Sequence, residues 1–263
     1  MTAILRSEDV AKIENNLILL KSRYAKLVKR IFKLETFLTN AKAKEYLLHG
    51  AARRLGVIER CVENIYSIFP LQREQLLNWD ELKDVDINLH AFFVNIFGLL
   101  DNMAWVAVYE KDRRKGISKN DVGLYRIKTQ EILSDDFKKY LNSDRMKKWH
   151  DEYLKNYRDA LSHKIPLYVP PKSLTPGQKK QVADIEEKRN KAIKNEDFFL
   201  MDDLQKEEDN IGTPSPFFVH SLAETDNQMV VLHAQVITDF GTVEEIVEHF
   251  CTMFMPNDRN KPE

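Results

Sequence analysis

The chain has 263 residues, of which 43% are hydrophobic and 31% are charged, and its formal net charge is −1. This length and apolar content can bury one large core with appendages. A nearly neutral total charge argues against a globally basic nucleic-acid binder, so any contact with RNA has to come from local patches. The two cysteines, Cys61 and Cys251, are far apart and form neither a disulfide framework nor a metal motif. Together with an N-terminus that lacks a signal-peptide pattern, this predicts a cytoplasmic protein.

Residues 8–38 carry a nearly uninterrupted heptad of apolar side chains, which predicts a long amphipathic helix packed against another helix. The partner helix can belong to the same chain or to a second protomer. The heptad positions are Val10, Ile13, Leu17, Leu20, Tyr24, Leu27, Ile31, Leu34 and Leu38. The same stretch contains a cationic run without an acid, for which a solvated helix face is favoured over an RNA-binding patch. These cations are Lys21, Arg23, Lys26, Lys29, Arg30 and Lys33.

A second helix is expected over residues 42–68, with shorter helical pieces near 72–82 and 126–141. Residues 87–109 are apolar nearly all round, which predicts the central buried helix of a bundle. A membrane span is disfavoured because Asn95, Asp101 and Asn102 would lie near the middle of the bilayer.

A polar residue recurs every seven positions along this central helix, at Asn88, Asn95, Asn102 and Tyr109. Buried polar groups need hydrogen-bond partners. Two explanations are compatible with the pattern: an interhelical network that sets the register, or one wall of a cleft.

The next helix is predicted to begin after Ser143, a candidate N-cap, and to end near Lys164, because Pro166 disfavours helix at Ile165. Its last part reads Tyr157-Arg158-Asp159-Ala160-Leu161-Ser162-His163. Arginine matches phosphate oxygens as a planar, permanently charged fork, and histidine moves protons near neutral pH.

Asp159 and His163 are four residues apart on one helix face, so the carboxylate is expected to accept a ring N–H, and Arg158 and Ser162 form a second such pair. Arg158 and His163 are offset by roughly 140°, so a complete site needs a second surface. The alternative is a helix-end network of salt bridges. A second Arg and His with the same spacing, Arg145 to His150, is interpreted as a chance match because the residues between them are basic and the flanks look solvated.

The C-terminal part is predicted as two further regions. Residues 172–212 form a charged helical extension that begins with Thr175 as N-cap and Pro176 as first helical residue. Residues 213–256 form a β-hairpin and a terminal helix. The expected strands are Phe217–Leu222 and Met229–Phe240, and Thr242 with Glu245 is expected to cap the helix. His220 and His233 are expected to pack ordinarily on these strands. The predicted fold is therefore mainly α, an antiparallel helical bundle over 1–171 with these two regions attached.

Arg158, the polar Asp159 beside it and His163 resemble the R-x4-6-H motif of the HEPN superfamily, and the resemblance covers at most roughly residues 40–170. It implies a helical bundle that dimerises so that two motifs share one cleft. It also implies metal-independent RNA cleavage, in which Arg158 holds the scissile phosphate, His163 moves the proton and the RNA 2′-hydroxyl attacks. Many such proteins act in bacterial defence or toxin–antitoxin systems. Other members only bind nucleotides or proteins.

The sequence contains no phosphate-binding loop, no dinucleotide glycine fingerprint and no H-E-x-x-H metal motif, so no metal or cofactor is expected. We therefore predict a HEPN-like endoribonuclease, with a non-catalytic nucleotide-binding or protein-interaction module as the alternative. The expected partners are RNA or a nucleotide, a second copy of the chain, and a protein bound through 8–38 or 176–209, without a membrane. The candidate catalytic residues are Arg158, His163 and Asp159, and the candidate cleft residues are Asn95, Asn102, Ser162 and Tyr157.

Overall fold

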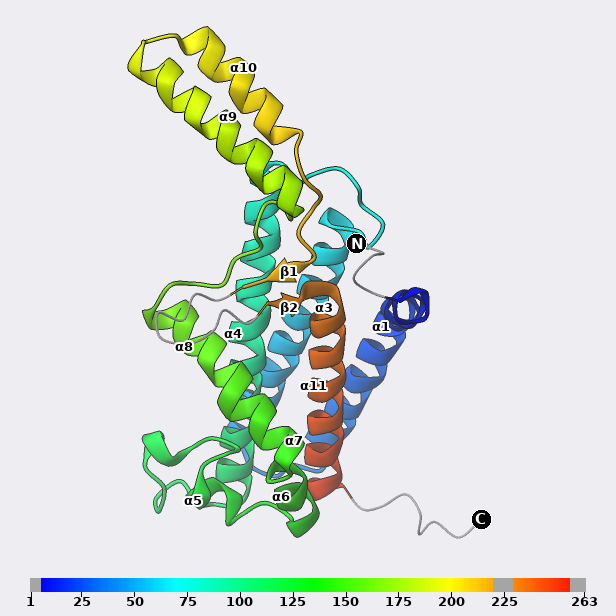
Figure 1. Cartoon of the computed structure of the whole chain (residues 1–263). Helices are drawn as coiled ribbons and strands as arrows, with labels where there is room; N and C mark the ends of the chain where they lie inside the picture. The colour runs from blue at the N-terminus through cyan, green and yellow to red at the C-terminus, as the bar shows by residue number, and fades with distance from the viewer. Residues whose placement is uncertain (1–5, 220–228, 256–263) are drawn as a thin grey trace.

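In a computed structural model of the chain, which describes residues 6–219 and 229–255, the protein is mainly α (Figure 1). Long helices form a bundle, a pair of helices projects from one end of it, and one short two-stranded sheet lies between the two parts. The predicted fold class is confirmed.

In the first half of the bundle the helices predicted over 8–38 and 42–68 are present. The helix expected near 72–82 was wrong, because residues 69–78 form turns and the next helix begins at Trp79. The N-terminal helix ends at Glu35, three residues before its predicted end. The segment from Ala41 is helical without a break up to Ile68, although seven of its residues form π-helical turns. The elements are α1 (Ser7–Glu35), α2 (Ala41–Glu45), the π-helical η1 (Tyr46–Ala52) and α3 (Arg53–Ile68).

The apolar heptad of α1 packs within the same chain. Its buried residues belong to the main core, and α1 lies against η1, α3 and the last helix, α11 (Leu232–Phe254). Two part-buried ion pairs link α1 to α11: Arg23 with Glu244, and Arg30 with Glu248 at 3.0 Å. The open choice between an internal and an external partner for this heptad is therefore decided in favour of the internal one.

The central helix is α4 (Trp79–Glu110), which begins with a capping box formed by Asn78 and Glu81. By length and hydropathy α4 could cross a membrane, and the core helix of a soluble protein has the same properties. Its side chains from Leu82 to Val108 supply thirteen buried residues of the bundle, as predicted for a central helix.

After α4 the chain forms a loop and a series of short helices before the motif helix. Ser143 caps α7 by accepting the N–H of Met146, as predicted. The last helix of this series ends at His163, and Lys164 is extended. The elements are η2 (Lys119–Asp121), α5 (Ile127–Gln130), α6 (Asp135–Leu141), α7 (Asp144–Lys147), the π-helical η3 (Lys148–Leu154) and α8 (Lys155–His163).

The charged extension forms a helical hairpin of α9 (Pro176–Lys194) and α10 (Phe198–Asp209), which projects from the bundle (Figure 1). Thr175 caps α9 in a capping box with Gln178, and Pro176 is its first residue, as predicted. This arm has a small core of its own, made of Val182, Ile185, Leu204 and Ile211.

The C-terminal region differs from its prediction. A hairpin exists, but it pairs only β1 (Phe217–Phe218) with β2 (Val230–Val231), in antiparallel register. The expected second strand up to Phe240 was wrong, because α11 begins at Leu232 and its buried residues recur at helical rather than alternating spacing. Thr242 lies inside this helix, where its hydroxyl donates to the Thr238 carbonyl at 3.2 Å, so the expected cap was also wrong.

Residues 220–228, which the expected hairpin includes, lie outside the described ranges. His220 and Leu222 are among them. His233 is fully buried on α11 and its ring Nε2 lies 2.5 Å from the Phe69 carbonyl oxygen. Because α11 packs into the main core with α1 and α3, it is part of the bundle rather than an appendage to it.

Candidate functional site

The predicted Asp159–His163 hydrogen bond is not formed. The Asp159 carboxylate instead lies 3.0 Å from Nη1 of Arg158, its neighbour. His163 is exposed at the end of α8, as is Ser162. The four-residue spacing placed Asp159 and His163 on one face correctly, but a guanidinium that stays charged competes better for a carboxylate than an exposed imidazole does.

Tyr157 belongs to the core. It is buried against Phe93, Tyr153 and Phe218, with ring centroids 5.1, 4.7 and 5.5 Å away. Burial raises the pKa of its hydroxyl to about 12. A side chain in this position is unavailable for stacking on a base, so Tyr157 does not line a cleft.

The asparagines of α4 form an interhelical network with α3. Arg54 donates to Asn95 Oδ1 at 3.1 Å through Nη1 and to Asn102 Oδ1 at 3.0 Å through Nε. Gly98 lies between them under the guanidinium, where a Cβ would be 2.4 Å from Arg54 Cζ. Glycine is therefore needed for this close approach. The first of the two explanations for the polar stripe accounts for these contacts.

Two of the predicted site residues line cavities: Asn102 borders one of about 190 Å³ beside η1, and Arg158 borders a larger one that is lined by several cations. The Arg158 guanidinium lies over the ring of Phe97, 4.2 Å from the centroid, and about a third of the side chain is exposed. Its Nε is buried and has no hydrogen-bond partner among the described residues. Arg158 and Phe97 both line this cavity, of about 300 Å³, between α4, the loop before α5, and the η3–α8 helix.

His150, although its spacing from Arg145 was interpreted as a chance match, lines this same cavity. Its ring stacks on Tyr125 with centroids 3.7 Å apart and lies 6.1 Å from that of Phe97. Nδ1 lies 2.8 Å from the carboxylate of Asp151. Burial lowers the pKa of His150, and Asp151 opposes this shift only in part. At neutral pH the imidazole is therefore largely neutral, and its Nδ1 is oriented by a carboxylate.

The helix geometry explains how His150 and Arg158 meet. Eight residues apart in a regular α-helix, two side chains would be offset by about 80°. Residues Lys148–Leu154 are π-helical, however. A π-helix has more residues per turn than an α-helix, so each residue rotates the chain by a smaller angle about the helix axis. The offset shrinks, and the histidine of one Arg–His segment comes to share a cavity with the arginine of the other.

The cavity is rich in cations. Besides Arg158 it is lined by Lys119, Arg126 and Lys155, and none of these three forms an ion pair with any residue in the ranges 6–219 and 229–255. The acids that line it are Asp101 and Asp151. Burial raises the pKa of Asp101, although Arg158, Arg54 and Arg126 counteract part of the effect.

A local excess of cationic residues indicates this site in the sequence, although the net charge of the whole chain is close to zero. Seven cationic and two acidic residues lie between Lys111 and Lys128, in a chain whose net charge is −1. The loop supplies Lys119, Tyr125 and Arg126 to the cavity. Sequence reasoning missed these residues because it weighed the charge run of α1 and not that of the loop.

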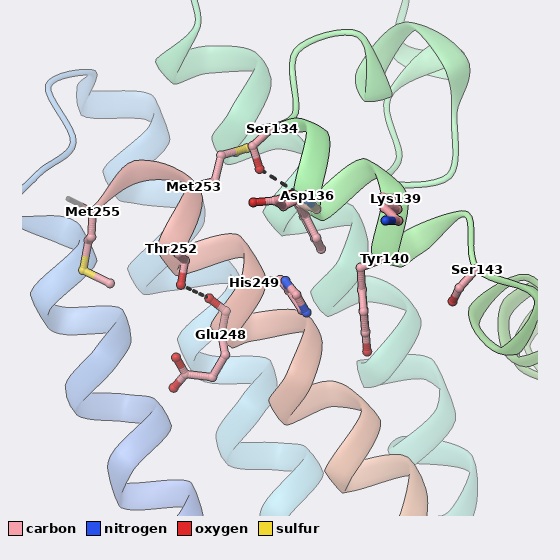
Figure 2. Close-up of a pocket in the computed structure, with 11 residues that line it drawn as sticks. Ser134, Asp136, Lys139, Tyr140, Ser143, Glu248, His249, Thr252, Met253 and Met255 are labelled. Carbon is pink, nitrogen blue, oxygen red and sulfur yellow. Dashed lines mark hydrogen bonds between the residues drawn. The ribbon is translucent and has the colours of Figure 1, made fainter. Parts of the chain in front are cut away.

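A larger cavity, of about 820 Å³, lies between α6 and the C-terminal end of α11 (Figure 2). Its wall includes His249, whose ring stacks on Tyr140 at 4.2 Å. The charged side chains that line it are Asp136, Lys139 and Glu248. None of the predicted site residues reaches it, and its carboxylates do not favour an anion. The cavity around Arg158 is therefore the candidate site.

No family model, no curated protein and no solved structure matches the chain. The resemblance to HEPN proteins consequently rests on the Arg–His motif and the helical setting alone.

Proposed function

We propose that the chain binds a phosphate-bearing ligand, a nucleotide or RNA, in the cavity around Arg158. The observation that supports this most directly is the charge of the cavity wall: the Arg158 guanidinium, whose side chain is about a third exposed, lines the cavity together with three more cations. A phosphate oxygen can accept hydrogen bonds from the exposed part of such a planar, permanently charged fork. The volume of about 300 Å³ suits one nucleotide unit.

Binding is tested by fluorescence anisotropy with a labelled oligouridylate and with adenosine monophosphate as competitor. Arg158→Gln should weaken binding about 10- to 100-fold, because hydrogen bonds to charged groups contribute roughly 1.5–3 kcal/mol. Arg158→Lys should recover little of this, since a point charge does not reproduce the planar fork. The matched control is Arg60→Gln on α3, which removes an exposed arginine paired with Glu63. Equal losses in both variants, or no binding by the wild type, would refute the proposal.

Metal-independent RNA cleavage by 2′-hydroxyl attack is the second candidate function, and one observation favours it. His150, a mostly buried imidazole with Nδ1 oriented by Asp151, lines the same cavity as Arg158. The neutral ring can accept a proton through Nε2. The HEPN-like mechanism, in contrast, assigns proton transfer to His163, which is exposed and outside the lining of the cavity.

The two histidines are compared in an RNA cleavage assay in the presence of EDTA. Cleavage should leave a 2′,3′-cyclic phosphate and spare DNA, which lacks the nucleophile. Loss of a positioned acid or base slows such a reaction by about 10² to 10⁴-fold. We expect this loss for His150→Ala and little change for His163→Ala. The reverse result would restore the mechanism that the HEPN resemblance implies, in which a second protomer completes the site, and that dimer stays a prediction.

A further inference from the structure

The projecting arm ends in a surface that its own fold does not use. Phe199 is 91% exposed and Phe198 63% exposed at the start of α10, with Ile193 and Leu200 exposed beside them. Four carboxylates and one lysine lie between Ile193 and Asp203. Two of these acids, Asp202 and Asp203, pair with Lys206 one turn further along α10, at 2.5 and 3.7 Å. We call these apolar side chains, together with the acids around them, the arm tip. Its side chains add nothing to the small core of the arm, which is made of other residues.

The arm is built to hold this tip in place. Glu208 on α10 lies 2.6 Å from Arg189 on α9 and 3.4 Å from Lys172 at the base of the arm, and all three side chains are less than a quarter exposed. Arg189 also donates to Gln205 across the hairpin. These part-buried contacts fasten the two helices to each other and to the chain that enters the arm. The tip is therefore presented on a fixed support.

A second surface of the same molecule has the complementary character. The outward face of α1 exposes Ile18, Leu19 and Phe32 at 77%, 44% and 56%. Six cationic residues and no acid lie between Ile18 and Lys33. Arg23 and Arg30 turn inward to pair with α11, whereas Lys26 and Lys29 are exposed and have no ion-pair partner within the described residues. We call this face the α1 stripe.

We propose that the arm tip of one copy docks on the α1 stripe of a second copy. One surface is apolar and acidic, the other is apolar and basic, and complementary charges of this kind select a partner and its register. In Figure 1 the tip lies at the far end of the arm, on the opposite side of the molecule from α1. The two surfaces of one chain therefore cannot cover each other, while those of two chains can.

Reciprocal docking accounts for both surfaces at once. If each copy places its tip on the stripe of the other, the contact closes around a twofold axis and occurs twice in the dimer. The buried aromatic anchors are then Phe198 and Phe199, a type of residue that supplies much of the binding energy of interfaces. This contact is independent of the Arg158 cavity and of the proposed function.

The test is sedimentation velocity of the full chain over a concentration series at low and high salt. The wild type should dimerise, and high salt should weaken the dimer because the attraction is partly ionic. Asp202→Lys with Asp203→Lys should weaken it at least about 10-fold, and so should Lys26→Asp with Lys29→Asp. Combining the four substitutions in one chain should restore it, since the charges are exchanged between the two surfaces.

Two further variants keep the result interpretable. Phe199→Ser should weaken the dimer without a charge change, and circular dichroism should show that its helices persist. Asp184→Lys with Glu186→Lys reverses the same amount of charge on α9, more than one turn from the tip, and should leave dimerisation unchanged.

A wild type that stays monomeric at high concentration would overturn the proposal. The proposal would also be overturned if each pair of substitutions breaks the dimer and the variant that combines all four substitutions does not restore it. A monomeric wild type whose Lys26→Asp and Lys29→Asp variant instead loses affinity for polyuridylate would assign the α1 stripe to nucleic acid.

Discussion

Two segments of this chain have an arginine followed five residues later by a histidine, and the fold treats them differently. In the first, Arg145 pairs with Glu245 and lies against Tyr140, while His150 is mostly buried and lines a cavity. In the second, Arg158 lines that cavity and His163 is exposed at a helix end. The candidate site thus combines the arginine of one segment with the histidine of the other.

The comparison teaches that spacing along a helix does not identify the members of a site. Equal spacing along the chain gives equal angles around the helix axis only while the helix is regular. Here His150 lies in π-helical turns, whereas His163 lies in a regular α-helix. What separates the segments is their packing. The first is anchored from both sides by aromatic rings and a buried carboxylate, and the second ends in solvent.

The largest effect on stability is expected from removing the carboxylate of Asp239, which anchors the first segment. Asp239 on α11 is fully buried and accepts hydrogen bonds from Trp149 Nε1 at 2.8 Å, Tyr153 at 2.6 Å and Gln235 at 3.0 Å. Asp239→Ala leaves these donors without an acceptor, so we expect a loss of about 3 kcal/mol in the free energy of unfolding. Urea denaturation measures it.

The matched change in the second segment is Asp159→Ala. Asp159 is about a third exposed and its ion-pair partner is the adjacent Arg158. Exposed pairs of this kind contribute roughly 0–1 kcal/mol, so the variant should unfold at nearly the wild-type urea concentration. Similar losses for both aspartates would contradict the contrast drawn between the segments.

A smaller effect on stability is expected from changing Tyr125, whose ring covers His150. The hydroxyl of Tyr125 is buried and has no hydrogen-bond partner within residues 6–219 and 229–255, and burial raises its pKa. Tyr125→Phe removes an unsatisfied group and keeps the stacked ring, so thermal stability should stay the same or rise by up to about 1 kcal/mol. If this hydroxyl contacts the proposed ligand, the same variant should bind oligouridylate more weakly. A clear loss of stability would show that the hydroxyl has a partner in solution.

The smallest effect concerns the ionisation of His150. Its folded-state pKa is depressed by burial, so its contribution to stability is present above the unfolded value of about 6.5 and is lost as the pH falls through the folded one. In an NMR titration its ring signals should change at a pH below about 6.5. Inorganic phosphate should raise that midpoint, because a bound anion favours imidazolium. A midpoint that phosphate does not move would place the anion elsewhere.

Much of the fold could be predicted because its cues are local. The heptad of α1, the apolar run of α4 and the caps at Ser143 and Thr175 each lie within a few residues of the structure that they specify. The second strand up to Phe240 failed because β-branched and aromatic residues are also compatible with a buried helix, and only packing against α1 and α3 decides between the two.

The candidate site was predictable in part. Arg158 was singled out from its residue type and place on the helix, and it is the one predicted site residue that lines the candidate cavity. Asn95 and Asn102 were identified as polar residues in need of partners, but the partner, Arg54, is more than forty positions away and carries no pattern of its own.

The sequence by itself determined that this chain is helical, where several of its helices begin or end, and which faces they bury, because those properties depend on neighbours within a turn or two. Which histidine meets Arg158, and whether Asp159 serves His163 or Arg158, was decided only by the tertiary structure. The physical reason is that a cavity is made by segments far apart in the chain: here a ring from α4, cations from a loop, and a helix whose π-helical turns rotate His150 toward Arg158.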